Sequence, residues 1–209
     1  MLHTLRFVTP GAMVILFWIS SLAMITKSPD LLEFEISKVL YSLPALIFGV
    51  VYYVTPLRNA FNAPFFVRVD ENLRKKLIEM AGVDDEPNIL TWEKIRNVVF
   101  YPIIDNDNSL TLRSKQVMFN GFLWTTCADA RALSAIFALL TGVLWALKIP
   151  SAPTLFAIFT AVFLLSLVLS ELITRKHIEL GNEQLELIRH QYLEQVKTSL
   201  ENIIAQSGN

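Results

Sequence analysis

The stretch IPSAPTLFAIFTAVFLLSLVLS, residues 149–170, runs for 22 residues without a charged side chain. About 20 apolar residues, each rising about 1.5 Å along a helix, cross a hydrocarbon core of roughly 30 Å. This stretch is therefore long enough to cross a membrane as one helix. We expect it to do so.

Three other blocks lack charge over a comparable length: Phe7–Thr26, Val39–Leu57 and Ala132–Leu147. The last has only 16 residues, so a full span needs the neighbouring Asp129–Arg131 and Lys148, whose charged ends can reach toward the headgroups. A soluble protein of 209 residues has no layer thick enough to bury four such helices. We therefore predict a mainly α protein with four transmembrane helices.

The basic residues predict the orientation of these spans. If the N-terminus is cytoplasmic, the outer loops hold three of the 18 Lys and Arg side chains, namely Lys27, Lys38 and Lys148. A cluster of Arg58, Arg68, Arg74, Lys75 and Lys76 follows the second block on the inner side. Because basic residues favour the cytoplasmic side, we predict a multi-pass protein of the bacterial inner membrane with both termini in the cytoplasm.

This topology divides the chain into four parts. Residues 1–57 form transmembrane helices 1 and 2, residues 58–128 a cytoplasmic insertion, residues 129–170 helices 3 and 4, and residues 171–209 a cytoplasmic amphipathic helix. The insertion is too long for a simple connection. It is either a small α+β unit or a helical one.

The α+β alternative depends on two short strands in the insertion. Residues 65–69 alternate as a strand does, and residues 109–112 could pair with them. Between them we expect a helix from an N-capping Asp70 to Met80, ended by Gly82. A second helix should begin after an N-capping Thr91 and end at Pro102.

The last part of the chain carries one apolar stripe at spacings of three and four residues. Such a stripe must be covered by the insertion of the same chain, by another copy, or by a separate protein. We therefore predict a cytoplasmic packing or partner interface made of Leu185, Ile188, Tyr192, Val196 and Leu200.

Two further surfaces are predicted from residue type. Small residues four apart in the third span allow close helix contact, within one bundle or between copies: Ser134, Ala138, Gly142 and Ala146. The basic run Arg74, Lys75 and Lys76 lies near the predicted inner surface, so we expect it to contact lipid headgroups. The stretch Pro56–Arg131, which includes the insertion, carries ten basic and ten acidic residues, and this balance argues against direct binding of nucleic acid.

No motif in the sequence names a reaction. Phosphate-binding glycine loops, nucleophile elbows and zinc-protease helices are absent, and one cysteine forms no intramolecular disulfide. Residues 105–109 read as a polar turn and Glu186 with His190 as a solvated helix face. The charge-free blocks also lack the carboxylates typical of coupled transporters. We predict no catalytic, cofactor-binding or metal-binding residues.

From these residues we expect a scaffold or sensor that forms homo-oligomers and recruits a soluble cytoplasmic protein. An alternative is an oligomeric pore or membrane-disrupting effector, which would leak ions from liposomes, whereas a scaffold would not. A further alternative is a lipid-modifying enzyme. Its only candidate residues are Trp124, Cys127 and Asp129.

The layout of two spans, an insertion and two spans resembles the membrane-subunit family of the Kiwa anti-phage defence system. The resemblance covers the whole chain and is one of layout, with FFVRVDENLRKK and MFNGFLWTT as the stretches where family likeness should be tested. It implies a homo-oligomeric membrane sensor of phage infection. It also implies that a soluble, DNA-associated effector subunit is recruited at the cytoplasmic face.

Overall fold

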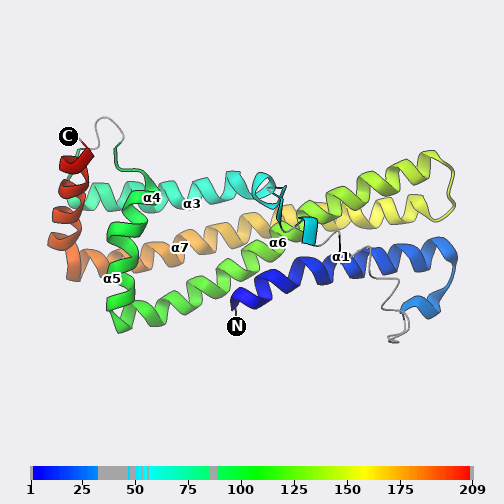
Figure 1. Ribbon diagram of the computed structural model, residues 1–209, viewed down its shortest axis with the longest axis horizontal. Helices are drawn as coiled ribbons and strands as arrows, with labels where there is room; N and C mark the ends of the chain where they lie inside the picture. Colours follow the sequence, from blue (N-terminus) through cyan, green and yellow to red (C-terminus); the bar gives the residue numbers. More distant parts are fainter. Residues whose placement is uncertain are drawn as a thin grey trace. The chain divides into compact units, whose positions relative to one another are not determined.

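The computed structural model describes residues 2–32, 47, 50–52, 54, 55, 57–84 and 89–207 (Figure 1). Within these residues the chain is helical and contains no strand. The helices are α1 (Leu2–Thr26), η1 (Pro29–Leu32), α3 (Leu57–Ala81), α4 (Trp92–Ile95), η3 (Arg96–Phe100), α5 (Tyr101–Asn106), α6 (Asn108–Ala146) and α7 (Ala152–Ser207).

Three of these helices are long and apolar enough to cross a membrane. They are the Val8–Thr26 part of α1, α6 and α7. The prediction of a mainly α membrane protein is therefore confirmed at this level. The predicted span Val39–Leu57 falls mostly outside the described residues, so a fourth transmembrane helix stays a prediction.

Contacts divide the chain into two compact units, each built from two separate stretches. Unit 1 consists of Met1–Ala63 and Phe122–Leu172, and unit 2 of Pro64–Gly121 and Ile173–Asn209. Both α6 and α7 contribute to both units, because each continues without interruption through the boundary.

Unit 1 is packed by aromatic and aliphatic side chains from helices far apart in the sequence. The ring centroid of Phe17 in α1 lies 5.5 Å from that of Phe137 in α6 and 5.1 Å from that of Phe159 in α7. The outer surface of the same helices is also apolar, since Leu139 is 72% exposed and Val168 is 60% exposed. A soluble protein rarely exposes such a surface, and lipid is the solvent that suits it.

In unit 2 the prediction of an α+β insertion is wrong for the described residues. Residues 65–69 lie inside the helix α3, and residues 109–112 form the beginning of α6. A longer pattern overrides the short alternation, because Val69, Leu73, Leu77 and Ala81 are all buried and recur every four residues. These four residues lie on one face of α3, and burial of that face favours a single continuous helix.

The predicted helix ends in unit 2 are partly correct. The helix α3 begins well before Asp70, which is therefore not its N-cap. Gly82 does end it, with a φ of +63° and an N–H that donates to the Ile78 oxygen at 3.1 Å. Thr91 is an N-cap, accepting a hydrogen bond from the Lys94 N–H at 3.5 Å.

Pro102 does not end the helix that Thr91 begins. The turn Arg96–Phe100 is π-helical, and the Tyr101 N–H donates to the Arg96 oxygen five residues back. The helical register therefore changes immediately before the proline, which then lies near the start of α5. A proline is tolerated in the first turn of a helix, because the N–H that it lacks has no partner there in any case.

Candidate functional site

Four buried polar side chains form hydrogen bonds inside unit 1. The Tyr52 hydroxyl donates to Asp129 Oδ1 at 3.1 Å, and Arg131 Nη2 donates to Asn62 Oδ1 at 3.0 Å. Each of the four residues is at most 2% exposed. We call Tyr52, Asn62, Asp129 and Arg131 the polar cluster.

The polar cluster joins two regions that are about 70 residues apart in the chain. Asp129 and Arg131 both lie on α6, two residues apart, so their side chains leave the helix in different directions. Their partners come from the end of the second charge-free block and from the first part of α3. Each charged side chain therefore has its own polar partner, and the two bonds fix the register of α6 against the preceding segment.

The sequence led us to expect the charged ends of Asp129 and Arg131 to reach the lipid headgroups. In the structure they instead point into unit 1, with exposures of 1% and 2%. The reason is that Tyr52 and Asn62 supply hydrogen bonds inside. Charged groups buried at membrane helices are costly and are usually kept for function. This makes the polar cluster the strongest candidate site in the described chain.

A donor on Asn62 of the polar cluster has no hydrogen-bond partner among the described residues. This donor is Asn62 Nδ2, while Oδ1 of the same side chain accepts from Arg131. A buried amide group left unpaired costs roughly 1–3 kcal/mol. The arrangement around Asn62 is therefore held at a cost.

Charge-free blocks alone do not reveal the polar cluster. Asp129 and Arg131 mark the boundary of the third block, so this pattern predicts them at the membrane surface. A signal was present in the sequence, since Trp124, Ala128 and Leu133 around them are apolar, and all three are buried. A helix that is apolar on both sides of a charged pair indicates burial of that pair.

The three residues considered for lipid chemistry differ in their surroundings. Trp124 is buried, Cys127 is half-buried and Asp129 accepts a hydrogen bond from Tyr52. Cys127 and Asp129 are two residues apart on a helix and so point in different directions. In the described part of the chain, no group of three His, Cys, Asp or Glu side chains could hold a metal ion.

The ridge of small residues on α6 packs at least partly within the chain. Ser134 is fully buried, and a Cβ placed on Gly142 would lie 3.5 Å from the Phe156 ring of α7. Ala138 packs against the cluster of Phe137, Leu155 and Phe159, whereas Ala146 is exposed. A role of this ridge between copies stays a prediction.

The C-terminal stripe is buried in unit 2. Leu185, Ile188, Val196 and Leu200 are at most 2% exposed, and Tyr192 is half-buried. The stripe is therefore covered by its own chain. A direct role in binding a partner stays a prediction.

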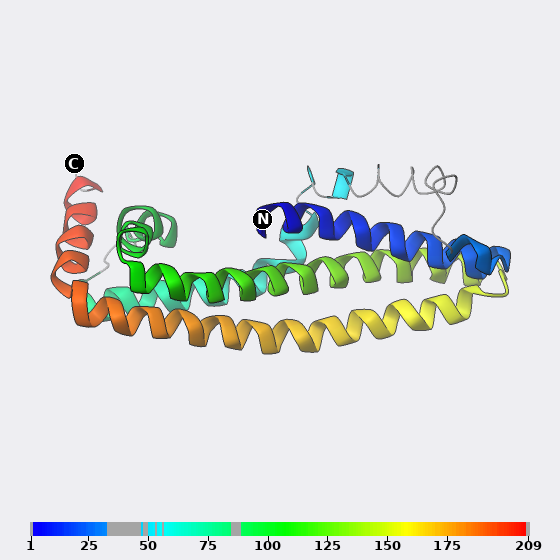
Figure 2. The same cartoon turned by 90° about the horizontal axis from the view of Figure 1, so that it is seen from below.

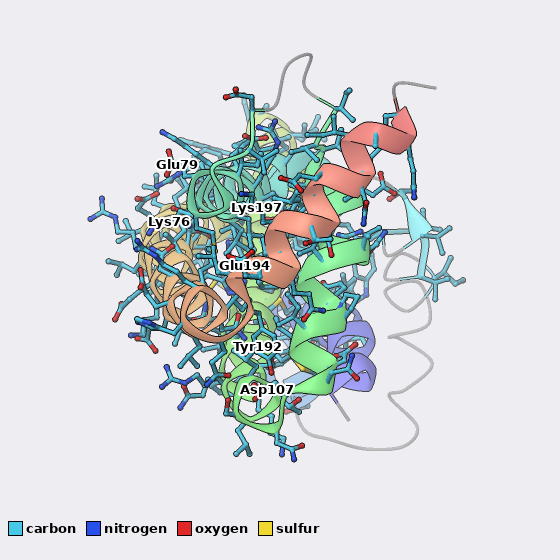
Figure 3. All side chains as sticks on the ribbon, turned by 90° about the vertical axis from the view of Figure 1, so that its left-hand side faces the viewer. Lys76, Glu79, Asp107, Tyr192, Glu194 and Lys197 are labelled. Carbon is cyan, nitrogen blue, oxygen red and sulfur yellow. The ribbon has the colours of Figure 1, made fainter. Side chains whose placement is uncertain are left out.

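Asp107 holds the C-terminal part of α7 and the start of α6 together (Figure 3). Its Oδ1 accepts from the Ser109 hydroxyl at 2.6 Å, and its Oδ2 accepts from the Tyr192 hydroxyl at 2.7 Å. These hydrogen bonds, that of Ser109 first, lower the pKa of Asp107 to about 2. The same contact raises the pKa of Tyr192, so the phenol stays protonated and able to donate.

The three basic residues predicted to contact lipid headgroups differ in their surroundings. Arg74 Nε donates to the Leu90 oxygen at 2.6 Å, so this side chain holds the segment before Thr91. Lys75 is exposed and forms an ion pair of 3.6 Å with Glu79, while Lys76 is half-buried. Lipid contact by the two lysines stays a prediction.

Replacing Tyr52 with Phe should destabilise unit 1 by about 1–3 kcal/mol, because the change removes the hydrogen bond to a buried carboxyl group. The measurement is unfolding in mild detergent. Tyr101→Phe is the matched control, since Tyr101 is 48% exposed and the same atom is removed. Equal stability of the two variants would show that the bond to Asp129 contributes nothing.

Replacing Tyr192 with Phe should raise the pKa of Asp107 from about 2 toward its ordinary value. A carboxyl group with a lowered pKa stabilises the folded state above its ordinary pKa, and this contribution is lost as the pH falls toward 2. In the variant this contribution is smaller, and what remains of it is lost at a higher pH. Carboxyl-carbon NMR of Asp107 measures this shift. Ser109→Ala, which removes the larger contribution, should raise the pKa further, and an unchanged value in Tyr192→Phe would contradict the assignment.

No family model matches this chain, and neither the curated proteins nor the solved structures compared with it gave a match. The chemistry of its own residues is therefore what supports a function.

Proposed function

We propose that this chain is a non-enzymatic scaffold or sensor of the bacterial inner membrane. It self-associates and recruits a soluble cytoplasmic partner. Both termini and unit 2 lie in the cytoplasm. In keeping with the layout resemblance noted above, the event that it senses is phage infection.

The main support for this proposal is that α6 and α7 are each uninterrupted helices. The 39 residues of α6 extend for about 60 Å, roughly twice the thickness of the hydrocarbon core. The 56 residues of α7 form a still longer helix. Each helix therefore has both an apolar span and a part in unit 2. A rigid element shared by two environments transmits a displacement from one to the other.

The polar cluster suits the membrane end of such a relay. Its bonds connect α6 to the segment after the second block, so a shift of either element changes the pairing of Asp129 or Arg131. Buried charges resist intermediate arrangements, because an unpaired charge is expensive in a low-dielectric interior. Two discrete arrangements are favoured over a continuous range, which is what a sensor requires.

Unit 2 has the charged outer surface that we expect at the cytoplasmic end of this sensor. Its outer surface carries charges of both signs, as in the exposed ion pairs of Lys75 with Glu79 and of Lys176 with Glu179. A protein partner is the class that recognises such a mixed surface, whereas a phosphate backbone requires an excess of positive charge.

Inserting Gly-Gly-Ser between Gly121 and Phe122 should abolish signalling while leaving the protein in the membrane. The insertion interrupts α6 where unit 2 gives way to unit 1, so a displacement is no longer transmitted. The measurement is survival of cells that carry the chain with its genomic neighbours after phage challenge.

The matched control is the same insertion between Gly82 and Val83, in the turn after α3. This variant should protect cells as the unaltered chain does. Protection by the α6 insertion would mean that continuity of the helix is not needed for function.

A reporter enzyme active only in the periplasm should stay inactive when inserted after Gly82 or fused after Ser207. Both positions lie in unit 2, which we place in the cytoplasm. The control is a truncated fusion after Ser28, which we place outside, and this fusion should be active. Activity from either unit 2 position would overturn the proposed orientation.

A further inference from the structure

One side of α6 stays exposed in unit 2 although it carries large apolar side chains. Leu112 is 64% exposed and Phe119 is 56% exposed, and Lys115 and Gln116 between them are exposed as well. Residues that are three, four or seven positions apart lie on one side of a helix. We call Leu112, Lys115, Gln116 and Phe119 the α6 face. Figure 2 shows this part of α6 in green, as a straight helix beside α7.

The opposite side of the same turns packs α6 against the rest of unit 2. Leu110 is fully buried, and the Ser114 hydroxyl accepts a hydrogen bond from Gln184 Nε2 of α7 at 3.0 Å. Arg113 forms an ion pair of 3.5 Å with Glu183 of α7. The contacts that hold α6 in unit 2 therefore do not use the α6 face. An apolar surface left open outside a membrane span is a usual sign of a binding site.

Lipid does not reach the Leu112 end of this face. With residues 149–170 across the membrane, as proposed above, the Gln184 that bonds to Ser114 comes about 14 residues after Ser170, or about 21 Å along α7. The headgroup layer adds only about 5–8 Å beyond the hydrocarbon core. Even a helix tilt of about 40° leaves the level of Ser114 about 16 Å from the core, which is beyond the headgroups.

The Phe119 end of the face lies nearer to the membrane. Asn120 Nδ2 donates to the Ile173 oxygen of α7 at 3.2 Å, and Ile173 comes just after the charge-free stretch. The α6 face thus begins close to the headgroup layer and extends into the cytoplasm. What covers all of it is a protein that approaches from the cytoplasmic side.

Charge indicates the kind of protein that fits. Between Asn108 and Ala128, α6 contains two basic residues, Arg113 and Lys115, and no acidic one. Arg113 is paired within the chain, whereas Lys115 forms no ion pair among the described residues. A cationic side chain beside two apolar ones is complementary to an apolar stripe that has acidic residues next to it.

A second copy of this chain is a poor occupant of the α6 face. Copies in one membrane share an orientation, so a two-fold axis along the membrane normal would bring each α6 face against its own equivalent. The two Lys115 side chains would then lie close together. Like charges that face each other across an interface oppose association.

We propose that the α6 face docks a helix of the soluble cytoplasmic partner, through an apolar stripe flanked by acidic residues. The inference rests on the proposed function and names the surface that recruits the partner. Leu112 and Phe119 are two helical turns apart, so they fit between the side-chain ridges of a helix laid along α6. The Gln116 amide between them can donate and accept hydrogen bonds, which fixes the register of the docked helix.

Electron paramagnetic resonance of a nitroxide label identifies what covers the α6 face. In a Cys127→Ala background, the label is attached at Leu112→Cys or, as the lipid-facing control, at Leu139→Cys, and the protein is placed in nanodiscs. We expect a water-soluble nickel complex to relax the label at 112 and oxygen, which concentrates in lipid, to relax the label at 139. The lipid pattern at both positions, or spin–spin broadening between copies labelled at 112, would rule the proposal out.

Two designed peptides test the charge preference. Each has about 18 residues, enough for a helix with a leucine stripe, and carries either Glu or Lys beside that stripe. Fluorescence anisotropy measures their binding to the protein in phosphatidylcholine nanodiscs, with empty nanodiscs as the baseline. We expect the acidic peptide to bind about tenfold more tightly than the basic one, and Lys115→Glu to reverse this order. Equal affinities, or an order that Lys115→Glu leaves unchanged, would contradict the acidic flanks.

The same assay locates the docking surface. Leu112→Glu with Phe119→Glu should weaken binding of the acidic peptide about tenfold, because a charge then faces the apolar stripe of the peptide. Val67→Glu is the control, since Val67 is an apolar residue of α3 in the same unit and is 56% exposed. This variant should bind as the unaltered chain does. An equal loss in both variants would place the peptide elsewhere and refute the α6 face.

Survival after phage challenge separates this inference from the proposed function. Cells that carry the chain with its genomic neighbours should lose protection with Leu112→Glu and Phe119→Glu together, and keep it with Val67→Glu. Full protection by the double variant would mean that the α6 face is not the docking surface, while the proposed function stands. If the unaltered chain gives no protection, the proposed function itself fails.

Discussion

The helices α6 and α7 are long and apolar enough to cross a membrane, and each continues well beyond the length that a bilayer requires. Inside a bilayer no water is present to pair an exposed N–H or C=O group, so a spanning segment has to be a helix. In both helices the same helical bonding continues beyond the apolar span into unit 2. The two units therefore share their main elements, and what distinguishes them is only the chemistry of their side chains.

The side chains follow this division. In unit 1 the core is made of rings such as Phe17 and Phe159, and the outer surface is apolar as well. In unit 2 the core remains apolar, at Leu77 and Ile95 for example, but the outside carries ion pairs. An inward apolar stripe is common to both units. The outward face alone indicates which solvent surrounds each of them.

Two features go against the local preferences of the sequence. The polar cluster places Asp129 and Arg131 in the interior of unit 1, where charges are costly, and α7 changes direction within unit 2 although residues 182–198 contain no proline or glycine (Figures 1 and 2). Departures from local sequence preferences tend to occur at functional sites, where a free-energy cost in the folded state is retained for the sake of function. In this chain the two violations lie in different units. The continuous helices α6 and α7 connect them.

The mainly α class could be predicted from the amino-acid sequence, because a charge-free run of about 20 residues that crosses lipid has to be helical. The sequence also determined individual caps, such as Gly82 and Thr91, because these depend on the backbone within a few residues. Three features became clear from the folded chain: residues 65–69 are helical, Pro102 lies within a helical segment and Asp129 faces inward. For Asp129 the outcome depends on Tyr52, 77 residues away, and a local pattern carries no information about such a partner. Residues 65–69 follow the longer period of buried residues in α3, and Pro102 follows a π-helical turn that shifts the register just before it.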